Sequence, residues 1–454
     1  MEEYKTNTLT EYIFAPFNTF IYLNIDAIRL KGMGDIKSRL VDYLNKTEIF
    51  FDKGDTSILW TLEDSKDFKI SKGVFTPPGE DTSFVMAQLN TGTSSCCPIK
   101  EQVTELFNTN SLEFADVKFY FSNSGVGTCS VHINIKSKES IAILQLEKIS
   151  EKLNTLFKDY FEEICFILTK KYVEAINQLN IPQYEFEFLP DITTIDRSKH
   201  FIPWTHRIYH IHDDNLISHE NPGIFFKTLV TPSRKMDIED LSIYDNRYVY
   251  FGWGHSLIFT SSQEDGYSQT TKPVYDYVRL VEIAQAQWQF LDVLKDIVTF
   301  TNASYNQHYN QMGLSDTNSA INEIRRFDNA VDRLIADYSG VKITFDTEKR
   351  ILLNELHERW LTQSMLESLQ SSLERMQSLL DQLYQRQKEK QEESLNTIAL
   401  LFTILGVIDV LAIFFDIISP AITLTPLIQI ITLIIGTLVM AFAIKIYLGY
   451  ATRG

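Results

Sequence analysis

Cysteine is scarce in this sequence, and its placement excludes two common kinds of scaffold. The 454 residues include four cysteines: Cys96 and Cys97 are adjacent, whereas Cys129 and Cys165 stand alone. This arrangement matches neither the disulfide framework of a small secreted domain nor the paired spacing of a zinc site. The sequence therefore predicts a protein of a reducing compartment.

Positive charge is also in short supply. Lysine and arginine together number 42, against 59 aspartate and glutamate residues, which gives a formal net charge of −17. Residues 397–454 contain two acids and two bases, so the whole net charge belongs to residues 1–396. Such a charge repels phosphate backbones and argues against a nucleic-acid polymer as partner, whereas it suits a soluble domain or one that attracts metal cations.

Sequence motifs of catalysis are missing as well. The chain contains no Walker loop, no nucleophile with a matching base and no paired metal motif. We therefore predict that the protein is not an enzyme and requires no cofactor, and a divalent cation such as Mg²⁺ stays open as a bound ion. The first residues, "MEEYKTNT", lack the basic start and apolar core of a signal peptide, so the domain over residues 1–270 is expected in the cytosol.

Two long apolar runs near the carboxyl end are the strongest feature that the sequence does have. Residues 397–418 contain two aspartates as their only charges, and residues 424–448 carry no charge between Leu427 and Ile444. Each run is about as long as a helix must be to cross a hydrocarbon core of roughly 30 Å. With Pro420 and Pro426 between Ile418 and Leu427, the runs predict a hairpin of two transmembrane helices; a pair of buried core helices is the alternative.

Basic residues indicate the orientation of this hairpin. Three precede the first span, two lie at and beyond the end of the second, and the connecting loop has none. These residues are Arg386, Lys388, Lys390, Lys445 and Arg453. By the positive-inside rule both ends face the cytosol. The sequence thus predicts a multi-pass protein of the inner (cytoplasmic) membrane with a cytosolic N-terminus and a cytosolic tail over residues 449–454.

The segment before the first span is expected to be helical. Neither proline nor glycine occurs between Phe345 and Leu405, so one helix can run from about residue 346 to 418, with residues 346–396 as a stalk. Apolar residues in it step by three and four positions, as in a coiled-coil seam: Leu366, Leu369, Leu373, Met376, Leu380 and Leu383. The seam packs either on copies of the chain or back on helices expected in residues 271–345, and the sequence leaves both open.

Residues 1–270 predict an α+β domain with a mixed sheet and with one long helix or two over residues 139–180. Two pairs of aromatic strands enclose Gly-x-Gly turns, at residues 125–127 and 252–254. The exposed amides of such turns could hold a phosphate. A glycine turn between antiparallel strands is the simpler interpretation, because neither turn leads into a helix.

A stretch rich in aromatic and basic residues around position 206 is the candidate ligand site. If it forms a strand, Trp204 and His206 share one face, because side chains alternate along a strand. Together with Arg207 and Tyr209 they could stack on a nucleotide and clamp it. The simpler interpretation is a surface strand that is rich in aromatics.

The same stretch contains the candidate metal ligands. Five of the nine histidines fall between residues 200 and 219, and His210, His212 and Asp213 bring three ligand-forming side chains close together. A His-x-His pair alone is a weak zinc signal, so a metal site here is one hypothesis beside that of a surface strand.

Two aspartates in the first apolar run are the candidate pore residues. Asp409 and Asp416 are seven residues apart, which puts them about 10 Å apart on one stripe of a helix. The same stripe continues toward the cytosol through Ile398, Phe402 and Leu405. Around a shared axis, several copies would form two acidic rings and an apolar constriction, as in a cation pore. The alternative is that Asp416 reaches headgroup water while Asp409 bonds to the second span.

The organisation of the chain resembles the CorA family of pentameric divalent-cation channels. The shared features are an acidic cytosolic α+β domain, a stalk helix that runs into the first of two C-terminal spans, and basic residues at the membrane junctions. The resemblance is architectural and covers the whole chain. The family's Gly-Met-Asn signature at the outer end of the first span is absent; that place reads "FFDIISPAI", with Asp416 about where the filter asparagine would be.

The resemblance implies a homopentamer that sits in a membrane and transports cations. The family also has CRISPR-associated members, thought to be antiviral effectors of type III systems that open in response to a small nucleotide, S-adenosylmethionine joined to AMP. An enlarged cytosolic domain without the signature is more similar to these members. A ligand-gated cation channel is therefore expected. A constitutive transporter of magnesium or another divalent cation, regulated by cytosolic metal, is the alternative, and a non-conducting membrane scaffold is a third class.

Overall fold

The computed structural model describes most of the chain, in separate segments. These are residues 5–46, 57–63, 70–72, 83–90, 105, 111–184, 201–212, 239–242, 247–252, 254–260, 273–308, 314–339, 341–343, 347–418 and short pieces between 430 and 442. The chain divides into unit 1, Met1–Thr301 with Phe327–Leu373, and unit 2, Asn302–Arg326 with Glu374–Gly454. Helices and strands both occur in quantity, so the predicted mixed α+β fold is confirmed.

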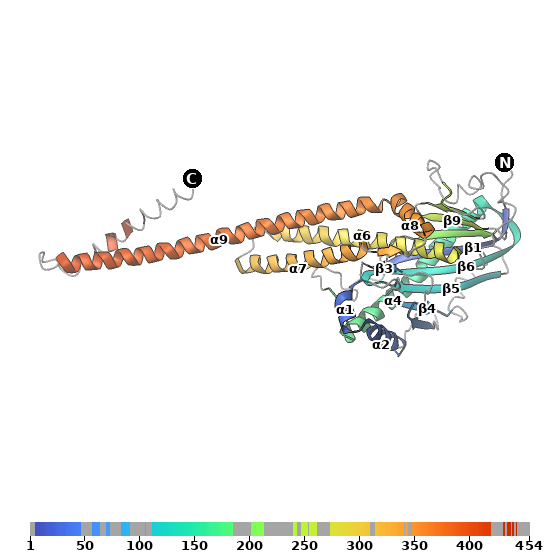
Figure 1. Ribbon diagram of the computed structural model, residues 1–454, viewed down its shortest axis with the longest axis horizontal. Coiled ribbons are helices and arrows are strands. Elements are labelled where there is room, and N and C mark those ends of the chain that lie inside the picture. Colours follow the sequence, from blue (N-terminus) through green and yellow to red (C-terminus); the bar gives the residue numbers. More distant parts are fainter. Residues whose placement is uncertain are drawn as a thin grey trace. The chain divides into compact units, whose positions relative to one another are not determined.

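A mixed sheet of eight strands organises unit 1 (Figure 1). Its strand order is β2-β4-β5-β6-β1-β7-β9-β8, and β7 and β9 form its parallel pair, whereas the other neighbours are antiparallel. Two further strands, β3 and β10, pair with each other. The strands are β1 Lys5–Tyr22, β2 Ile58–Thr61, β3 Ile70–Lys72, β4 Val85–Leu89, β5 Ser111–Phe121, β6 Ser124–Ala142, β7 His206–His212, β8 Arg247–Phe251, β9 His255–Thr260 and β10 Val341–Ile343.

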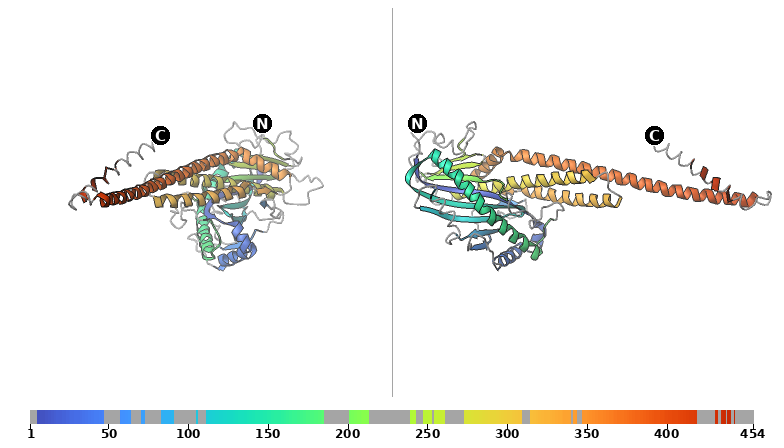
Figure 2. Two further views of the ribbon diagram at one scale, coloured as in Figure 1. Left: turned by 60° about the vertical axis from the view of Figure 1, so that its left-hand side comes forward. Right: turned by 180° about the vertical axis from the view of Figure 1, so that it is seen from behind.

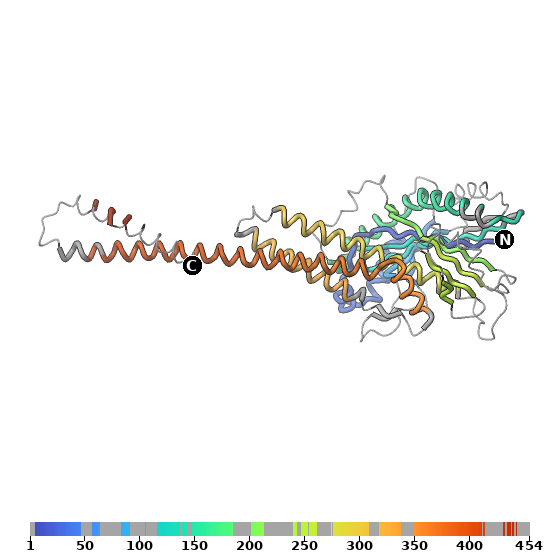
Figure 3. Tube along the Cα trace, turned by 90° about the horizontal axis from the view of Figure 1, so that it is seen from above, coloured from blue at the N-terminus to red at the C-terminus, as the bar shows by residue number. Residues whose placement is uncertain are grey.

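The helices of the described segments are α1 Ile25–Lys31, α2 Met33–Lys46, α4 Ile143–Gln178, α6 Pro273–His308, α7 Leu314–Ser339, α8 Thr347–Arg359 and α9 Thr362–Ile418. Three of the helices, α4, α6 and α7, lie close to where the hydrophobic pattern predicts them, whereas α1 and α2 were not predicted. The Asn24 side chain caps α1 by accepting a hydrogen bond from the amide of Ala27 at 3.0 Å. α9 is one continuous helix along its whole length, as Figure 3 shows.

Both faces of the sheet are covered, because strand residues alternate between two cores. On β1, Ile13, Ala15 and Phe17 belong to a core that α1, α2 and α4 complete on one face. Phe14 points the other way, into a core that α6 and α8 complete with Ile208 of β7. Figure 2 shows α4 lying across its face of the sheet. Unit 1 is therefore built of three layers, helices on a sheet on helices.

The expected helix from residue 346 to 418 is broken in the structure, and this part of the sequence prediction is wrong. α8 ends at Arg359 and α9 begins at Thr362. Between them Leu361 has φ of 53°, a left-handed conformation. The break has a tertiary cause: Trp360, which is 2% exposed, is held by hydrogen bonds to the sheet and to α6.

The apolar seam of α9 is buried within a single copy of the chain. Leu369 and Leu373 are buried in unit 1. In unit 2, Met376 and Leu383 are buried together with Tyr305 of α6 and Ile324 of α7. Of the two arrangements that the sequence leaves open, packing on the chain's own helices therefore accounts for this seam. The seam alone no longer requires a second copy.

Several predicted features lie outside the described residues. Of the second predicted span, 424–448, only short helical pieces between residues 430 and 442 are described. The tail, 449–454, and the candidate ligand Asp213 are not among the described residues. The C-terminal hairpin therefore remains a prediction.

Candidate functional site

The last part of α9 presents exposed apolar side chains in the part of the chain that the structure describes. Phe402 is 69% exposed, Leu405 is 56% exposed and Ile398 is 46% exposed. By length and apolar composition, α9 is the one helix among the described residues that suits a membrane crossing. Such a surface on a helix requires either lipid or another protein chain to cover it.

Asp409 lies on this exposed apolar helix and is itself exposed. The continuous helix also contains Asp416, two turns further on, although nothing is described of its side chain. All five predicted pore residues therefore lie on the single helix α9, with the helical spacing that the sequence analysis assumed. They are Ile398, Phe402, Leu405, Asp409 and Asp416.

The four candidate ligand residues do not form one site. His206 and Tyr209 are fully buried, and Arg207 is 7% exposed. His206 faces the α6 and α8 layer, where its Nε2 lies 2.8 Å from Ser256 Oγ. Trp204 packs edge to face on Trp288 and Trp360. Arg207 and Tyr209 point to the opposite face of the sheet, because neighbouring strand residues alternate.

Arg207 belongs to a buried polar cluster under α4. Its Nη1 donates to Ser150 Oγ at 2.9 Å, and the Tyr209 hydroxyl donates to the same oxygen at 2.9 Å. Ser150 in turn donates to the carboxylate of Glu11, and Arg207 Nη2 donates to Nε2 of His255. Burial, reinforced by the Arg207 cation, lowers the pKa of His255 to about 3, so the ring is a neutral acceptor. The guanidinium therefore already has protein partners.

Glu11 is the titratable centre of this cluster. Burial raises its pKa to about 7, although the Arg207 cation and the Ser150 hydroxyl act in the opposite direction. The folded state thus binds a proton that the unfolded chain releases at a pKa of about 4.5. Because the folded pKa is the higher one, this group stabilises the fold at low pH and the contribution is lost as pH rises through about 7.

Glu11→Gln should make the fold more stable than the parent above pH 7, by roughly 2–4 kcal/mol, and of similar stability near pH 5. Glutamine keeps the shape of the protonated acid and cannot ionise. Urea unfolding between pH 5 and 8 measures the difference in unfolding free energy between parent and variant. The titration of the histidines contributes equally to both proteins and cancels from this difference. A difference that stays constant over this range would contradict the assignment.

The candidate metal ligands on β7 share one partner. His210 Nε2 lies 2.9 Å and His212 Nδ1 lies 3.3 Å from the Thr260 hydroxyl on β9. Burial and the neighbouring His212 and His132 lower the pKa of His210 to about 4. Within the described segments, no group of three His, Cys, Asp or Glu side chains is arranged to hold a metal ion. The predicted set stays untested because Asp213 lies outside those segments.

The first Gly-x-Gly turn is explained by packing against aromatic rings. A Cβ on Gly125, whose φ is 80°, would lie 2.6 Å from the Tyr22 ring, and one on Gly127 would lie 2.3 Å from Phe17. Neither position tolerates a side chain, so both glycines serve the hairpin between β5 and β6. The turn interpretation accounts for them without a bound phosphate.

A buried ion triad around Arg279 was not found from the sequence. Arg279 of α6, 2% exposed, donates through Nη2 to Glu63 at 2.7 Å and through Nη1 to Glu282, and its guanidinium lies 4.1 Å from the centre of the Tyr120 ring. Ser83 donates its amide and hydroxyl to the other Glu63 oxygen. The Arg279 and Glu282 spacing on an apolar helix is the one sequence signal that could have indicated the triad.

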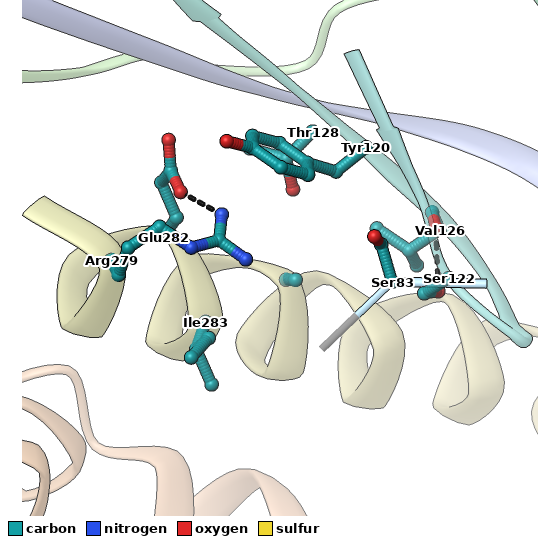
Figure 4. Close-up of a pocket in the computed structure, with 9 residues that line it drawn as sticks. Ser83, Tyr120, Ser122, Val126, Thr128, Arg279, Glu282 and Ile283 are labelled. Atoms are coloured by element: carbon teal, nitrogen blue, oxygen red, sulfur yellow. Dashed lines mark hydrogen bonds and ion pairs between the residues drawn. The ribbon is translucent and has the colours of Figure 1, made fainter. Parts of the chain in front are cut away.

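Figure 4 shows the cavity next to this triad, which we call the Arg279 pocket. The residues that line it include Tyr120, Ser122 and Thr128 of the sheet and Glu282 of α6. Its volume is about 30 Å³, which accommodates a water molecule or two. In this conformation the pocket is too small for a nucleotide.

A larger cavity lies between α1, α2 and the end of α4, and we call it the Lys31 pocket. Its volume is about 260 Å³, close to the lower end of small-molecule sites. Lys31 and Arg39 provide positive charge, Asp35 pairs weakly with Arg39 at 3.9 Å, and Ile36 and Ile181 add apolar surface. This cavity can accept a small molecule that has both an anionic and an apolar part.

No family model, curated protein or solved structure matches this chain in comparisons with known proteins. Fold and geometry therefore define a class: a mixed α+β protein with a mixed sheet, long helices and one long apolar helix suited to a membrane.

Proposed function

We propose that this chain is a subunit of a homo-oligomeric, CorA-like cation channel of the cytoplasmic membrane, and that its cytosolic α+β part gates the pore. The observation that carries the proposal is α9, which continues without a break into an exposed apolar segment that bears Asp409. A helix that only anchors a protein has no need of an aspartate, which costs roughly 2.5–3.5 kcal/mol at the bilayer centre.

An oligomer explains both the charge and the apolar surface of this segment. When copies of α9 surround an axis, Asp409 faces water and cations, while the remaining surface faces lipid and the second span. Phe402 and Leu405, on the same stripe nearer the cytosol, form an apolar ring able to close the pore by excluding water. Five copies follow from the family resemblance.

A small nucleotide that contains AMP, such as S-adenosylmethionine joined to AMP, is the proposed gating ligand, and antiviral defence is the proposed role. Both rest on the family resemblance. The Lys31 pocket supports the ligand class, because Lys31 and Arg39 offer charge for a phosphate beside an apolar floor. The alternative function, a constitutive magnesium transporter, predicts instead that cytosolic magnesium closes the pore with no nucleotide present.

Cation flux into liposomes tests the proposal. The full chain should conduct when an AMP-containing nucleotide is added at constant magnesium, and a chain truncated after Asn396 should neither conduct nor sediment with the liposomes, because it lacks the exposed apolar segment. Flux that is closed by millimolar magnesium alone would favour the transporter. Membrane binding without any flux would favour the scaffold.

The ligand site is tested on the same preparation. The double variant Lys31→Ala with Arg39→Ala should weaken nucleotide binding about tenfold or more in calorimetry, since it removes both cations from the Lys31 pocket. Lys46→Ala, an exposed lysine of α2 outside this pocket, is the matched control and should bind like the parent. Unchanged binding in the double variant would move the site elsewhere.

A further inference from the structure

The joint between α8 and α9 is a short helix break formed by Trp360 and Leu361. The Trp360 amide donates to Leu356 at 3.0 Å, as in an unbroken helix, and the Met365 amide donates to Leu361 at 3.2 Å. Between these two bonds Leu361 has a left-handed φ of 53°, and its amide donates to the carbonyl of Glu358, three residues back, at 3.1 Å. Figure 1 shows that α8 and the start of α9 run in different directions as a result.

Nothing in the local sequence favours this break. A left-handed residue at a helix end is usually glycine, because a Cβ is penalised there. Leu361 is instead a good helix former, and its side chain is 60% exposed, so burial of that side chain does not hold it in place. Neither proline nor glycine lies near the joint. The strained conformation must therefore be imposed by contacts around Leu361.

Trp360 supplies these contacts. Its indole Nε1 donates to the carbonyl of Gly252 at 3.1 Å, and its ring packs on Trp204 and His206. Its own carbonyl accepts from Nε1 of Trp288 at 3.1 Å. In an unbroken helix that carbonyl would accept from the amide four residues further on. The Trp288 side chain thus occupies the place of the helix's own donor.

A third contact crosses the break itself. Thr362, the first residue of α9, is 3% exposed, and its hydroxyl lies 3.2 Å from Nδ1 of His357 in α8. Burial lowers the pKa of His357 to about 4, so the ring is neutral and its nitrogen can accept from the hydroxyl. The three contacts together hold α8 at an angle to α9.

We propose that the Trp360–Leu361 joint is a two-state switch. In the clamped state, which the structure shows, Trp288 and Gly252 hold Trp360, and Leu361 is left-handed. In the released state Leu361 relaxes to the right-handed conformation, the carbonyl of Trp360 accepts from the main chain, and α8 and α9 merge into one helix. Its use in gating rests on the proposed function, whereas the switch itself rests on the geometry of the joint.

Spin-label distances across the joint test this proposal in the full chain in detergent. The labels replace Ile351, which is 42% exposed on α8, and Gln370, which is exposed on α9. Cys96 and Cys97 become serine, and the remaining two cysteines are buried. In one merged helix the backbone positions would be about 28 Å apart, at 1.5 Å for each of the nineteen residues, and any bend shortens this distance.

The parent should show the shorter distance alone. Trp360→Leu, which removes the indole donor and the ring contacts, should add a population near the distance of the merged helix. Trp288→Phe removes only the donor to Trp360 and keeps an aromatic ring, so it should produce the same population in a chain that is less perturbed. A single, parent-like distance in both variants would refute the switch.

Leu361 provides the matched control. Leu361→Gly should suppress the long-distance population of Trp288→Phe, because glycine adopts a positive φ freely and disfavours the merged helix. Leu361→Ala should leave it, because alanine favours the helix. Equal behaviour of glycine and alanine would also refute the switch. If the protein conducts cations but shows a single spin-label distance in every variant, the switch is refuted and the channel proposal stands. If two distances occur but no flux is measured, the channel proposal is refuted and the switch stands.

Discussion

Asp409→Leu should abolish cation flux and at the same time raise the melting temperature of the protein in detergent. Asp409 is exposed on the apolar part of α9, where an acid costs roughly 3 kcal/mol more than a leucine in a membrane environment. If Asp409 costs stability and can be replaced without harm to the fold, a role in conduction is the proposed reason for its presence. Liposome flux and thermal unfolding of the same preparation measure both effects.

Two further variants separate the role of the charge from that of the helix. Asp416→Asn should weaken the preference for cations over anions while flux continues, because it removes the carboxylates that form the outer acidic ring in the proposed channel. Val410→Leu, at an exposed apolar position beside Asp409, should change neither flux nor selectivity. If Asp409→Leu and Asp416→Asn both conduct like the parent, the aspartates are not pore residues and the scaffold becomes the better proposal.

Arg279→Met should destabilise the protein by about 3–5 kcal/mol, the usual cost of leaving buried charges without their partner. Arg279 is the cation between Glu63 and Glu282, and both of these side chains are 3% exposed. Methionine keeps most of the volume and the contact with the Tyr120 ring but removes the charge. Urea unfolding of the full chain in detergent, monitored by far-UV circular dichroism, measures the change.

The stability lost in Arg279→Met should come from the unpaired carboxylates of Glu63 and Glu282 and not from lost packing contacts of the Arg279 side chain. Adding Glu63→Gln to Arg279→Met should therefore recover part of the lost stability, since fewer unpaired charges remain buried. Arg39→Met, on the exposed face of α2, is the control and should change stability by no more than about 0.5 kcal/mol. A small effect of Arg279→Met would show that the triad contributes little to the fold.

Patterns of hydrophobicity predicted the elements because they reflect a local requirement. The pattern over residues 139–180 predicted the helix that the structure shows as α4, and the run at 397–418 predicted the apolar end of α9. Pairing of residues distant in sequence was not predictable in the same way. Glu63 and Arg279 are 216 residues apart, and no local pattern shows that their side chains meet.

The candidate ligand residues on β7 also show that a local pattern does not reveal how a site is assembled. Residue types indicated that Arg207 and His206 could bind a ligand, but the alternation of a strand sends them to opposite faces. Which face is covered, and by which helix, depends on how the whole sheet is packed. The sequence analysis favoured a surface strand here, which is wrong because β7 lies between β1 and β9 and most of its side chains are buried. It also could not tell that the Arg207 cation is used internally.

By itself the sequence determined the mixed α+β character, the position of the long apolar helix and the place of Asp409 on it, because these depend on side chains a few positions apart. Only the tertiary structure decided that the seam of α9 is buried within one chain and that the helix breaks at Leu361. The physical reason is competition for Trp360. Trp288, distant in sequence, donates to the Trp360 carbonyl that a continuous helix would use for its own hydrogen bond, and Gly252 accepts from the Trp360 indole. Local propensity favoured the unbroken helix, and long-range hydrogen bonds outweighed it.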